Sequence, residues 1–175
     1  MTATRLTTER LTLRAPEPVD KAAYVAFYTS PRRARTGTLL TKDVARQRFA
    51  GDCAHWQAKG YGRFVVADRA TGDILGMVGP HQPADYPEAE IAWHLWHDSA
   101  EGRGYAYEAA RAAQTHAFST LGWTTAVSYI DPANTRSIAL AERLGCARDT
   151  TAAIPDIDGW QAALVYRHPG PEALQ

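Results

Sequence analysis

Apolar and polar positions alternate along several short stretches of the chain. In residues 10–14, Leu11 and Leu13 are separated by polar Thr12 and followed by Arg14, which is the period of a half-buried strand. Other short apolar runs lie between Gly, Pro and Asp residues, the usual boundaries of strands. The predicted strands are residues 10–14, 63–68, 74–78, 88–96, 124–130, 147–151 and 160–167.

Apolar residues recur at helical spacing between these strands. Thr41 is a suitable N-cap and Gly60 a suitable end for a helix in which Ala45, Phe49, Cys53 and Trp56 share a face. The pattern predicts further helices over residues 20–28, from about residue 106, and over residues 134–144. In the helix after residue 105 one side is lined by alanines, which permits close packing on a sheet. These are Ala106, Ala109, Ala110, Ala113 and Ala117.

The order of these elements predicts a mixed α/β (α+β) fold around one twisted sheet. Early helices are followed by a hairpin at residues 63–78 and by two later helical crossovers. We expect residues 1–175 to form a single domain with a core at about 8–168. Residues 79–87 contain many helix and strand breakers, and we predict a loop that carries specificity.

Charge and composition restrict the classes of partner. The chain has 175 residues with 19 Lys and Arg against 19 Asp and Glu, so no general attraction to nucleic acid or to an anionic membrane is expected. Residues 1–10 contain no hydrophobic h-region and no run of about 18 apolar residues occurs, so we expect neither export nor a membrane span. Cys53 and Cys146 show no metal-ligand or redox spacing. We therefore expect a cytoplasmic protein that needs no metal.

A glycine turn between a predicted strand and a helix is the most informative stretch. The first N–H groups of a helix have no partner within the helix and carry partial positive charge, so they can bind a phosphate. Gly102 and Gly104 let an anion approach the backbone, and Arg103 adds a cation between them. An ordinary glycine turn is the alternative. The turn consists of Glu101, Gly102, Arg103, Gly104, Tyr105 and Ala106.

This turn resembles the acyl-CoA-binding motif of the GNAT superfamily of N-acetyltransferases, Gln/Arg-x-x-Gly-x-Gly/Ala. Gly104 and Ala106 match its last two positions, whereas Glu101 departs from its first. Residues 129–146 resemble the strand, Asn-x-x-Ser helix and Leu-Gly ending of the RimJ/RimL-type branch, which includes ribosomal-protein acetyltransferases. The two blocks and their order extend the resemblance to residues 5–168.

The resemblance implies the GNAT fold, in which a single twisted, mixed and mostly antiparallel sheet carries helices on both faces, and it implies acetyl-CoA as cosubstrate. In that fold two strands splay apart, and pantetheine lies in the gap like an added strand. Residues 101–106 would wrap the pyrophosphate, and amides near Leu95 and Trp96 would bind pantetheine or the thioester carbonyl. An acidic Glu101 would have to point its side chain away. Asn134 would cap its helix, contact pantetheine, or do both.

The amine that attacks the thioester must be neutral. A lysine amine, with a pKa of about 10.4, is much harder to deprotonate than an α-amino group at about 7.7 to 8.0. Glu90 occupies the strand position where several GNAT enzymes carry a base, and a role as an exposed strand carboxylate is the alternative. His94 shares strand parity with Glu90 and is either a second candidate base or a packing residue. Water is a third candidate for the base.

The leaving thiolate needs a proton. Many family members use a tyrosine seven residues after the motif asparagine, where this chain has Ala141. The Rim-type branch also lacks that tyrosine and carries a serine at the position of Ser137. Ser137 is therefore our candidate acid or donor to the thiol, unless its hydroxyl only bonds a helix carbonyl. Water could also supply the proton.

We expect an acetyl-CoA-dependent N-acetyltransferase that acts on a primary amine by direct attack in a ternary complex. A catalytically inactive acyl-CoA-binding module is the alternative that Glu101 and Ala141 suggest, and a homodimer is a further expectation. The acceptor amine, either a protein α-amino group or a small molecule, is left open. Arg32, Arg33 and Arg35 could hold an acidic substrate or a CoA phosphate, but we interpret them as a solvated loop outside the site.

Overall fold

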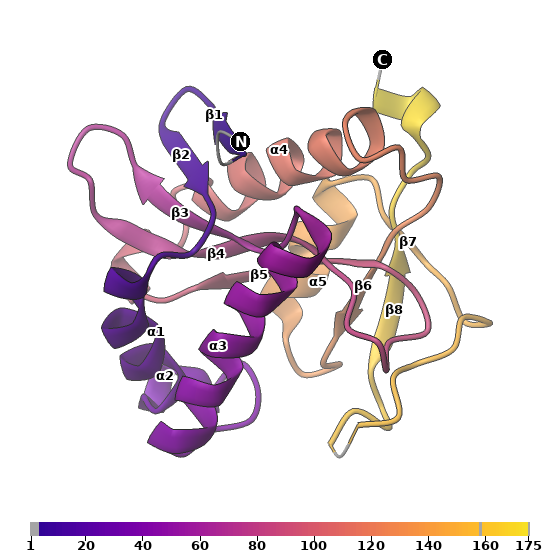
Figure 1. Cartoon of the computed structure of the whole chain (residues 1–175). Helices are drawn as coiled ribbons and strands as arrows, with labels where there is room; N and C mark the ends of the chain where they lie inside the picture. The colour runs from indigo at the N-terminus through magenta and orange to yellow at the C-terminus, as the bar shows by residue number, and fades with distance from the viewer. Residues whose placement is uncertain (1–3, 158, 175) are drawn as a thin grey trace.

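The computed structural model describes residues 4–157 and 159–174, which build an eight-stranded sheet with helices on both faces (Figure 1). The strands follow the order β1-β2-β3-β4-β5-β6-β8-β7 across the sheet. Their bounds are Arg5–Thr7 (β1), Leu11–Arg14 (β2), Phe64–Asp68 (β3), Ile74–His81 (β4), Glu90–Leu95 (β5), Val127–Ile130 (β6), Ala147–Arg148 (β7) and Leu164–Arg167 (β8).

Neighbouring strands are antiparallel except β5 and β6, which run parallel. The sheet is open, and it is mixed and mostly antiparallel, as the resemblance implies. The helices are α1 (Lys21–Tyr28), α2 (Pro31–Ala34), α3 (Lys42–Lys59), α4 (Tyr105–Ser119) and α5 (Thr135–Arg143), with short 3-10 segments at Pro18–Asp20, Asp98–Ala100 and Pro171–Leu174.

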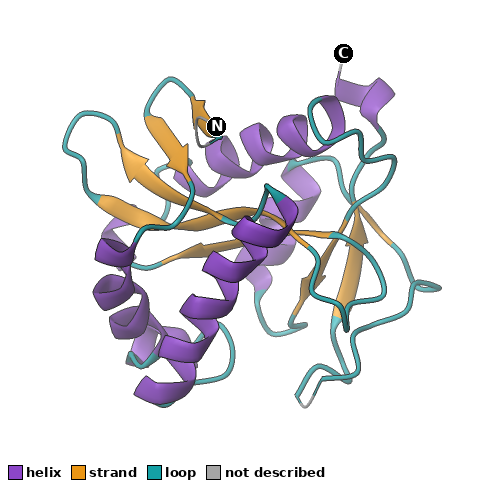
Figure 2. Cartoon of the chain, in the orientation of Figure 1, coloured by secondary structure: helices purple, strands orange, loops and turns teal. Residues whose placement is uncertain are grey.

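Helices cover both faces of the sheet (Figure 2), and each face carries its own hydrophobic cluster. On one face, side chains of α1 and α3 pack with Val65, Met77 and Trp96. On the other, α4 and α5 pack with Phe64, Val66 and other strand residues. Adjacent residues 64, 65 and 66 point to alternate faces, which is the two-residue period of a strand. Helices on both faces were predicted and are confirmed.

The caps predicted for the long helix are present. The Thr41 side chain accepts a hydrogen bond from the Val44 N–H at 3.3 Å, and α3 begins at the next residue. Gly60 ends α3 with φ of 73°, a left-handed conformation that suits glycine. The helix therefore has the ends that its sequence indicates.

The alanine side of α4 lies against the sheet. Four of the five alanines predicted to line it, Ala109, Ala110, Ala113 and Ala117, have no exposed surface, and the helix contacts β2, β4 and β5. Small side chains let the helix axis approach the strands closely. This packing holds the turn before α4 beside the C-terminal end of β5.

The structure corrects several predicted boundaries. Residues 79–81 belong to β4 and not to a loop, although the strand contains Pro80. Pairing with β3 ends at Val78, so Pro80 has only β5 as a strand neighbour and its missing N–H is tolerated there. Strands β7 and β8 are shorter than predicted, and β1 was not predicted. Over the residues described, no helix is both long and apolar enough to cross a membrane.

Candidate active site

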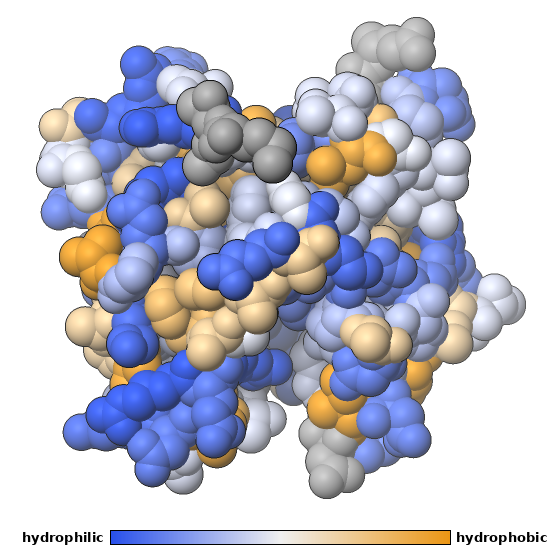
Figure 3. All heavy atoms as spheres, viewed as in Figure 1, coloured by the Kyte–Doolittle hydropathy of each residue, from blue (hydrophilic) through white to orange (hydrophobic). Residues whose placement is uncertain are grey.

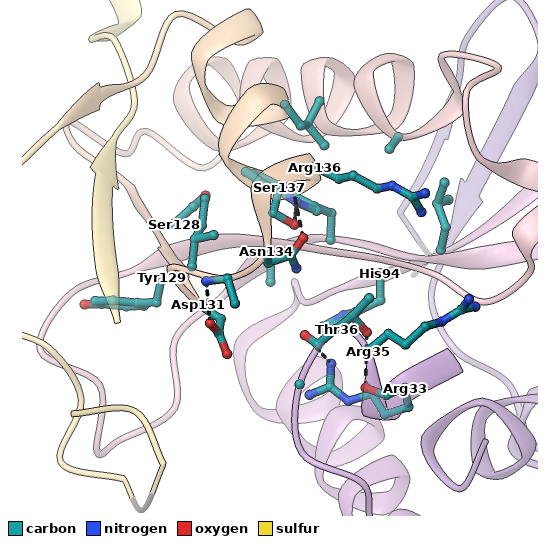
Figure 4. A pocket seen from close by; sticks show the side chains of 18 of the residues that line it. Arg33, Arg35, Thr36, His94, Ser128, Tyr129, Asp131, Asn134, Arg136 and Ser137 are labelled. Atoms are coloured by element: carbon teal, nitrogen blue, oxygen red, sulfur yellow. Dashed lines mark hydrogen bonds between the residues drawn. The ribbon is translucent and has the colours of Figure 1, made fainter. Parts of the chain in front are cut away.

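A cavity of about 1000 Å³ opens where β5 and β6 separate. Its walls come from both strands, the beginnings of α4 and α5, and the segment from α1 to residue 38 (Figure 4). In the space-filling view the molecule is hollowed at its lower edge, between the α3 side and the β8 side (Figure 3). A volume of this size suits a large cosubstrate together with a small acceptor.

Strands β5 and β6 pair at one point only. Their register contains the single pair Glu90 and Val127. One residue further, the Ser128 hydroxyl donates to the Ile91 carbonyl at 2.6 Å. Beyond this point the part of β5 that the structure describes has no paired residue on β6, so the predicted splayed strand pair is confirmed.

The free edge of β5 is formed by alternate residues. The Trp96 N–H donates to the Leu75 carbonyl at 2.8 Å, on the β4 side. Successive residues of a strand direct their backbone groups to opposite edges, so Trp93 and Leu95 direct theirs into the gap. The Leu95 carbonyl accepts a hydrogen bond from Arg32 Nε at 3.1 Å. The expectation that the Trp96 amide binds pantetheine or the thioester is therefore wrong, because this N–H is hydrogen-bonded to β4. The Leu95 amide faces the gap.

The glycine turn has the backbone that an anion site needs. Gly102 and Gly104 have φ of 70° and 79°, both in the left-handed region. Gly104 is the N-cap of α4, and no side chain among the described residues caps the helix. The first bond along the helix runs from the Glu108 N–H to the Gly104 carbonyl, so the amides at residues 105–107 have no partner within α4. A Cβ on Gly102 would meet open space, so the turn leaves room for a ligand.

Glu101 is bound between two cations. Its carboxylate accepts from Arg32 Nη2 at 2.6 Å and also pairs with Arg136 of α5. Arg32 is only 10% exposed in its side chain and also pairs with Asp98. The acidic residue at the first motif position is thus charge-balanced and does not present an unpaired carboxylate to a phosphate.

The Arg103 side chain lies outside the cavity. Its guanidinium stacks over the Tyr105 ring at 4.8 Å, as does that of Arg10 at 4.6 Å. The Tyr105 hydroxyl donates to Asp68 at 2.9 Å, and Arg103 lines a separate hollow beside that carboxylate. The expected cation between the two glycines is therefore not supplied by the Arg103 side chain, which lies over the Tyr105 ring and lines the other hollow.

The arginines after Pro31 correct a second expectation. They belong to a short helix and its cap, where Ser30 accepts the Arg33 N–H, and all three line the cavity. Arg33 is buried and Arg32 nearly so, whereas Arg35 is exposed and pairs with Asp98. They are not a solvated loop, because the helix packs against the end of β5 through the Arg32 contact with Leu95.

The start of α5 brings Asn134 and Ser137 to the gap. The Asn134 side chain caps the helix by accepting the Ser137 N–H at 3.2 Å, as predicted. The Ser137 hydroxyl accepts from the Trp93 indole N–H at 3.1 Å. Both residues line the cavity, and Figure 4 shows them next to each other above the β5 side.

Glu90 is a buried carboxylate at the other end of the gap. It is 5% exposed, and its carboxylate lies 3.3 Å from His81 Nδ1. His81 Nε2 lies 3.8 Å from Asp52, which forms a bidentate ion pair with Arg63. Tyr24 donates a further hydrogen bond to Asp52 at 2.9 Å. Glu90 is therefore not an exposed strand carboxylate, since a network of polar side chains holds it.

His94 lies on the same face of β5 as Glu90, as its parity predicts. Burial lowers its pKa well below the ordinary value, and the nearby guanidinium groups of Arg33, Arg63 and Arg48 lower it further. Its Nδ1 is buried without a hydrogen-bond partner in the described chain. A histidine in this position stays neutral at pH 7 and accepts a proton poorly.

Sequence reasoning missed Asp52, Arg63 and His81 as parts of the site. Asp52 lies three residues after Phe49 on the buried face of α3, so a carboxylate on an apolar helical face was the available signal. His81 lies in the segment that was predicted as a loop. No local pattern indicates that Asp52 meets Arg63, because that contact depends on how α3 packs on β3.

Comparisons with known proteins agree with this geometry. Residues 10–147 match the family described as "Acetyltransferase (GNAT) domain". The protein YkkB of Bacillus subtilis (strain 168) is 32% identical over 146 residues, which are 81% of this chain and 84% of that protein.

Solved structures give the same result. An acetyltransferase from Agrobacterium tumefaciens str. C58 has a TM-score of 0.88 and 38% identity, covering 97% of this chain and 96% of the other. The fold also resembles that of Mycobacterium smegmatis RimJ in complex with CoA-disulfide, with a TM-score of 0.72 and 20% identity over 94% of this chain and 83% of the other.

Proposed function

Because the chain belongs to the GNAT acetyltransferase family, we propose that this N-acetyltransferase transfers an acetyl group from acetyl-CoA to a primary amine. The reaction proceeds by direct attack of the amine on the thioester in a ternary complex. The observation that carries the proposal is the free edge of β5, which ends beside an uncapped helix N-terminus in one cavity.

Residues 102–106 bind the pyrophosphate of acetyl-CoA through backbone N–H groups. The uncapped amides at the start of α4 supply donors and the positive end of the helix dipole. Pairing of Glu101 with Arg32 and Arg136 removes the repulsion that a free carboxylate would cause. The turn binds through its backbone, and Arg103 does not contribute its side chain.

The edge of β5 holds the thioester. The Trp93 and Leu95 backbone groups face the gap and bond pantetheine as a neighbouring strand would. An N–H group on this edge donates to the thioester oxygen, and the bond strengthens as negative charge develops on that oxygen during attack. Asn134 lines the same wall and adds a polar contact to pantetheine.

Glu90 takes the proton from the acceptor ammonium, directly or through one water molecule. The neutral amine attacks the thioester carbon and the C–S bond breaks. The nitrogen then gives its second proton to the CoA thiolate, directly or through water, which leaves the acetylated amine and the CoA thiol. Ser137 donates a hydrogen bond to that thiolate. Its hydroxyl hydrogen is available because the bond to Trp93 uses an oxygen lone pair.

Two measurements on one sample test this proposal. The melting temperature with and without acetyl-CoA reports binding, and thiol release with a panel of amines reports transfer. A ligand at about 100 times its dissociation constant stabilises by roughly 2.7 kcal/mol, which corresponds to a rise of about 5 to 10 °C. Stabilisation without thiol release from any amine would indicate a binding module. No stabilisation at saturating acetyl-CoA would overturn the proposal.

A further inference from the structure

Arg33 is a buried cation without a carboxylate partner in the described chain. The residue is 7% exposed, and its Nη1 donates to the Thr36 carbonyl at 3.3 Å. Its Nε is buried and has no hydrogen-bond partner among the described residues. The guanidinium lies over the Tyr28 ring at 5.2 Å and fills the space where a Gly37 side chain would stand. The protein therefore holds a positive charge here with part of its bonding capacity unused.

A second guanidinium adds to this charge. Arg48 of α3 lies over the same Tyr28 ring at 5.6 Å and makes no ion pair within the part of the chain that is described. The charge of Arg63, the third cation of this region, is neutralised by its bidentate ion pair with Asp52. The depressed pKa of His94, caused by burial and then by all three arginines, is consistent with a positive potential at this end of the cavity.

Burying an unpaired charge is unfavourable, so a ligand anion that pairs with it gains more than an anion bound at the surface. Arg33 and Arg48 line the same cavity as Glu90. Figure 4 shows the Arg33 guanidinium beside Thr36 and close to His94, on the wall opposite Asn134 and Ser137. The amine of an acceptor bound in this region can contact the Glu90 carboxylate. A second, anionic group on the same acceptor can contact the guanidinium groups of Arg33 and Arg48.

We propose that the acceptor is an amine that also carries a carboxylate or phosphate group, and that Arg33 and Arg48 bind this group. The inference rests on the proposed acetyl transfer. Arg33 is the principal contact because it is buried and rigidly placed, and Arg48 closes the site from α3. A polyamine would bring further positive charge toward the two unpaired guanidinium groups and is disfavoured.

Matched acceptors test the charge preference. A dipeptide and its C-terminal amide present nearly the same amine, and phosphoethanolamine and ethanolamine form a second pair. We expect kcat/KM to be about 10- to 100-fold higher for the anionic member of at least one pair. In Arg33→Gln this preference falls to near unity and in Arg48→Gln it is reduced, while the KM for acetyl-CoA is unchanged in both variants. Arg46→Gln, an exposed neighbour on α3, is the control and retains the preference.

Three results would overturn the proposal. The uncharged acceptors could be used as well as the anionic ones, or Arg33→Gln could lower activity equally for both members of each pair. Alternatively, the loss could fall on the KM for acetyl-CoA, which would assign the arginines to a phosphate of the cosubstrate. Arg48→Gln keeps the test valid if Arg33→Gln does not fold, because Arg48 is exposed.

Binding of products separates this inference from the proposed function. The dissociation constants of an N-acetyl dipeptide and of its C-terminal amide can be measured by calorimetry with CoA present. This measurement does not require catalysis. We expect the carboxylate form to bind about 10-fold or more tightly in the wild-type protein and equally in Arg33→Gln. Equal affinity of the two forms for the wild-type protein would refute the anion site, even if acetyl transfer itself were established.

Discussion

The indole Nε1 of Trp93 donates a hydrogen bond of 3.1 Å to the Ser137 hydroxyl, joining the free edge of β5 to the first turn of α5. The bond fixes the serine oxygen as an acceptor and leaves its hydrogen for a ligand. We predict that Ser137→Ala lowers kcat by about 10- to 100-fold. This is the lower end of the loss in kcat that removing a catalytic proton donor causes. Ser137→Thr should keep most activity, and Ser99→Ala, at an exposed serine outside the cavity, serves as the control. An unchanged kcat in Ser137→Ala would remove the serine from the mechanism.

Gly102 and Gly60 form a matched pair for testing the turn. Both have φ near 70°, and a Cβ at either position would meet open space. Alanine at either position should therefore destabilise the fold similarly, by about 1 to 2 kcal/mol, through backbone strain. Only Gly102→Ala should also weaken acetyl-CoA binding, as measured by calorimetry. Equal acetyl-CoA affinities in the two variants would argue against backbone binding at residues 102–106.

Asp52 and Arg63 form a buried ion pair, with side chains that are 3% and 5% exposed. Removing one partner leaves the other charge uncompensated, so Asp52→Asn should lower the free energy of unfolding by about 3 to 5 kcal/mol. Asp43→Asn, which breaks an exposed pair with Arg46, should change it by less than about 1 kcal/mol. Urea unfolding measures both. Similar losses in the two variants would contradict a structural role for the buried pair.

The pair also predicts a pH dependence. Burial alone would raise the pKa of Asp52, but Arg63 outweighs burial and holds it below the ordinary value. A carboxyl whose folded pKa is depressed stabilises the fold above its unfolded pKa, about 3.9. That contribution disappears as the pH falls from this value through the lower folded pKa. Asp52→Asn should therefore be less sensitive to acid than the wild-type protein over this range.

His168 should make the fold sensitive to mild acid. Burial lowers its pKa to about 3, and its ring lies between Ser128 and Gln114 at 2.9 and 3.0 Å. In the unfolded chain this histidine binds a proton at about pH 6.5. The contribution of neutral His168 to the free energy of unfolding is therefore fully present above that pH and is lost as the pH falls toward 3. The expected slope for this group is about 1.4 kcal/mol per pH unit.

In His168→Gln the free energy of unfolding should depend less steeply on pH, because one titrating group has been removed. The burial-lowered pKa values of His55, His94 and His116 leave a residual slope of the same sign. His97→Gln, the same substitution at an exposed histidine, is the control. Urea unfolding at pH 7.5, 6 and 5 gives the comparison, and parallel curves for His168→Gln and wild type would show that His168 does not titrate on unfolding.

Local sequence rules predict the elements of this fold well. The caps Thr41 and Gly60, the buried alanines of α4 and the N-cap Asn134 follow from propensity and spacing, and all are present. The backbone of the glycine turn follows in the same way, because a left-handed φ before a helix favours glycine. These features depend on neighbours in sequence.

Side-chain directions in the site could not be predicted in the same way. Arg103 was expected beside the phosphate site, but its guanidinium lies over the Tyr105 ring and lines a separate hollow. Arg33 was expected in solvent, but the packing of α2 against β5 buries it. Each outcome depends on segments far apart in the chain, and a single sequence has no local signal for such contacts.

Whether Glu90 is the base is tested most directly by thiol release from acetyl-CoA, measured for the wild-type protein, Glu90→Gln and Glu142→Gln with an anionic amine as acceptor. Glu142 is exposed on α5 and lies outside the cavity. We predict that Glu90→Gln lowers kcat by about 100- to 10,000-fold, while its stabilisation by acetyl-CoA equals that of the wild-type protein. Glu142→Gln should behave as wild type. Turnover by Glu90→Gln at the wild-type rate would contradict the assignment of this buried carboxylate as the base.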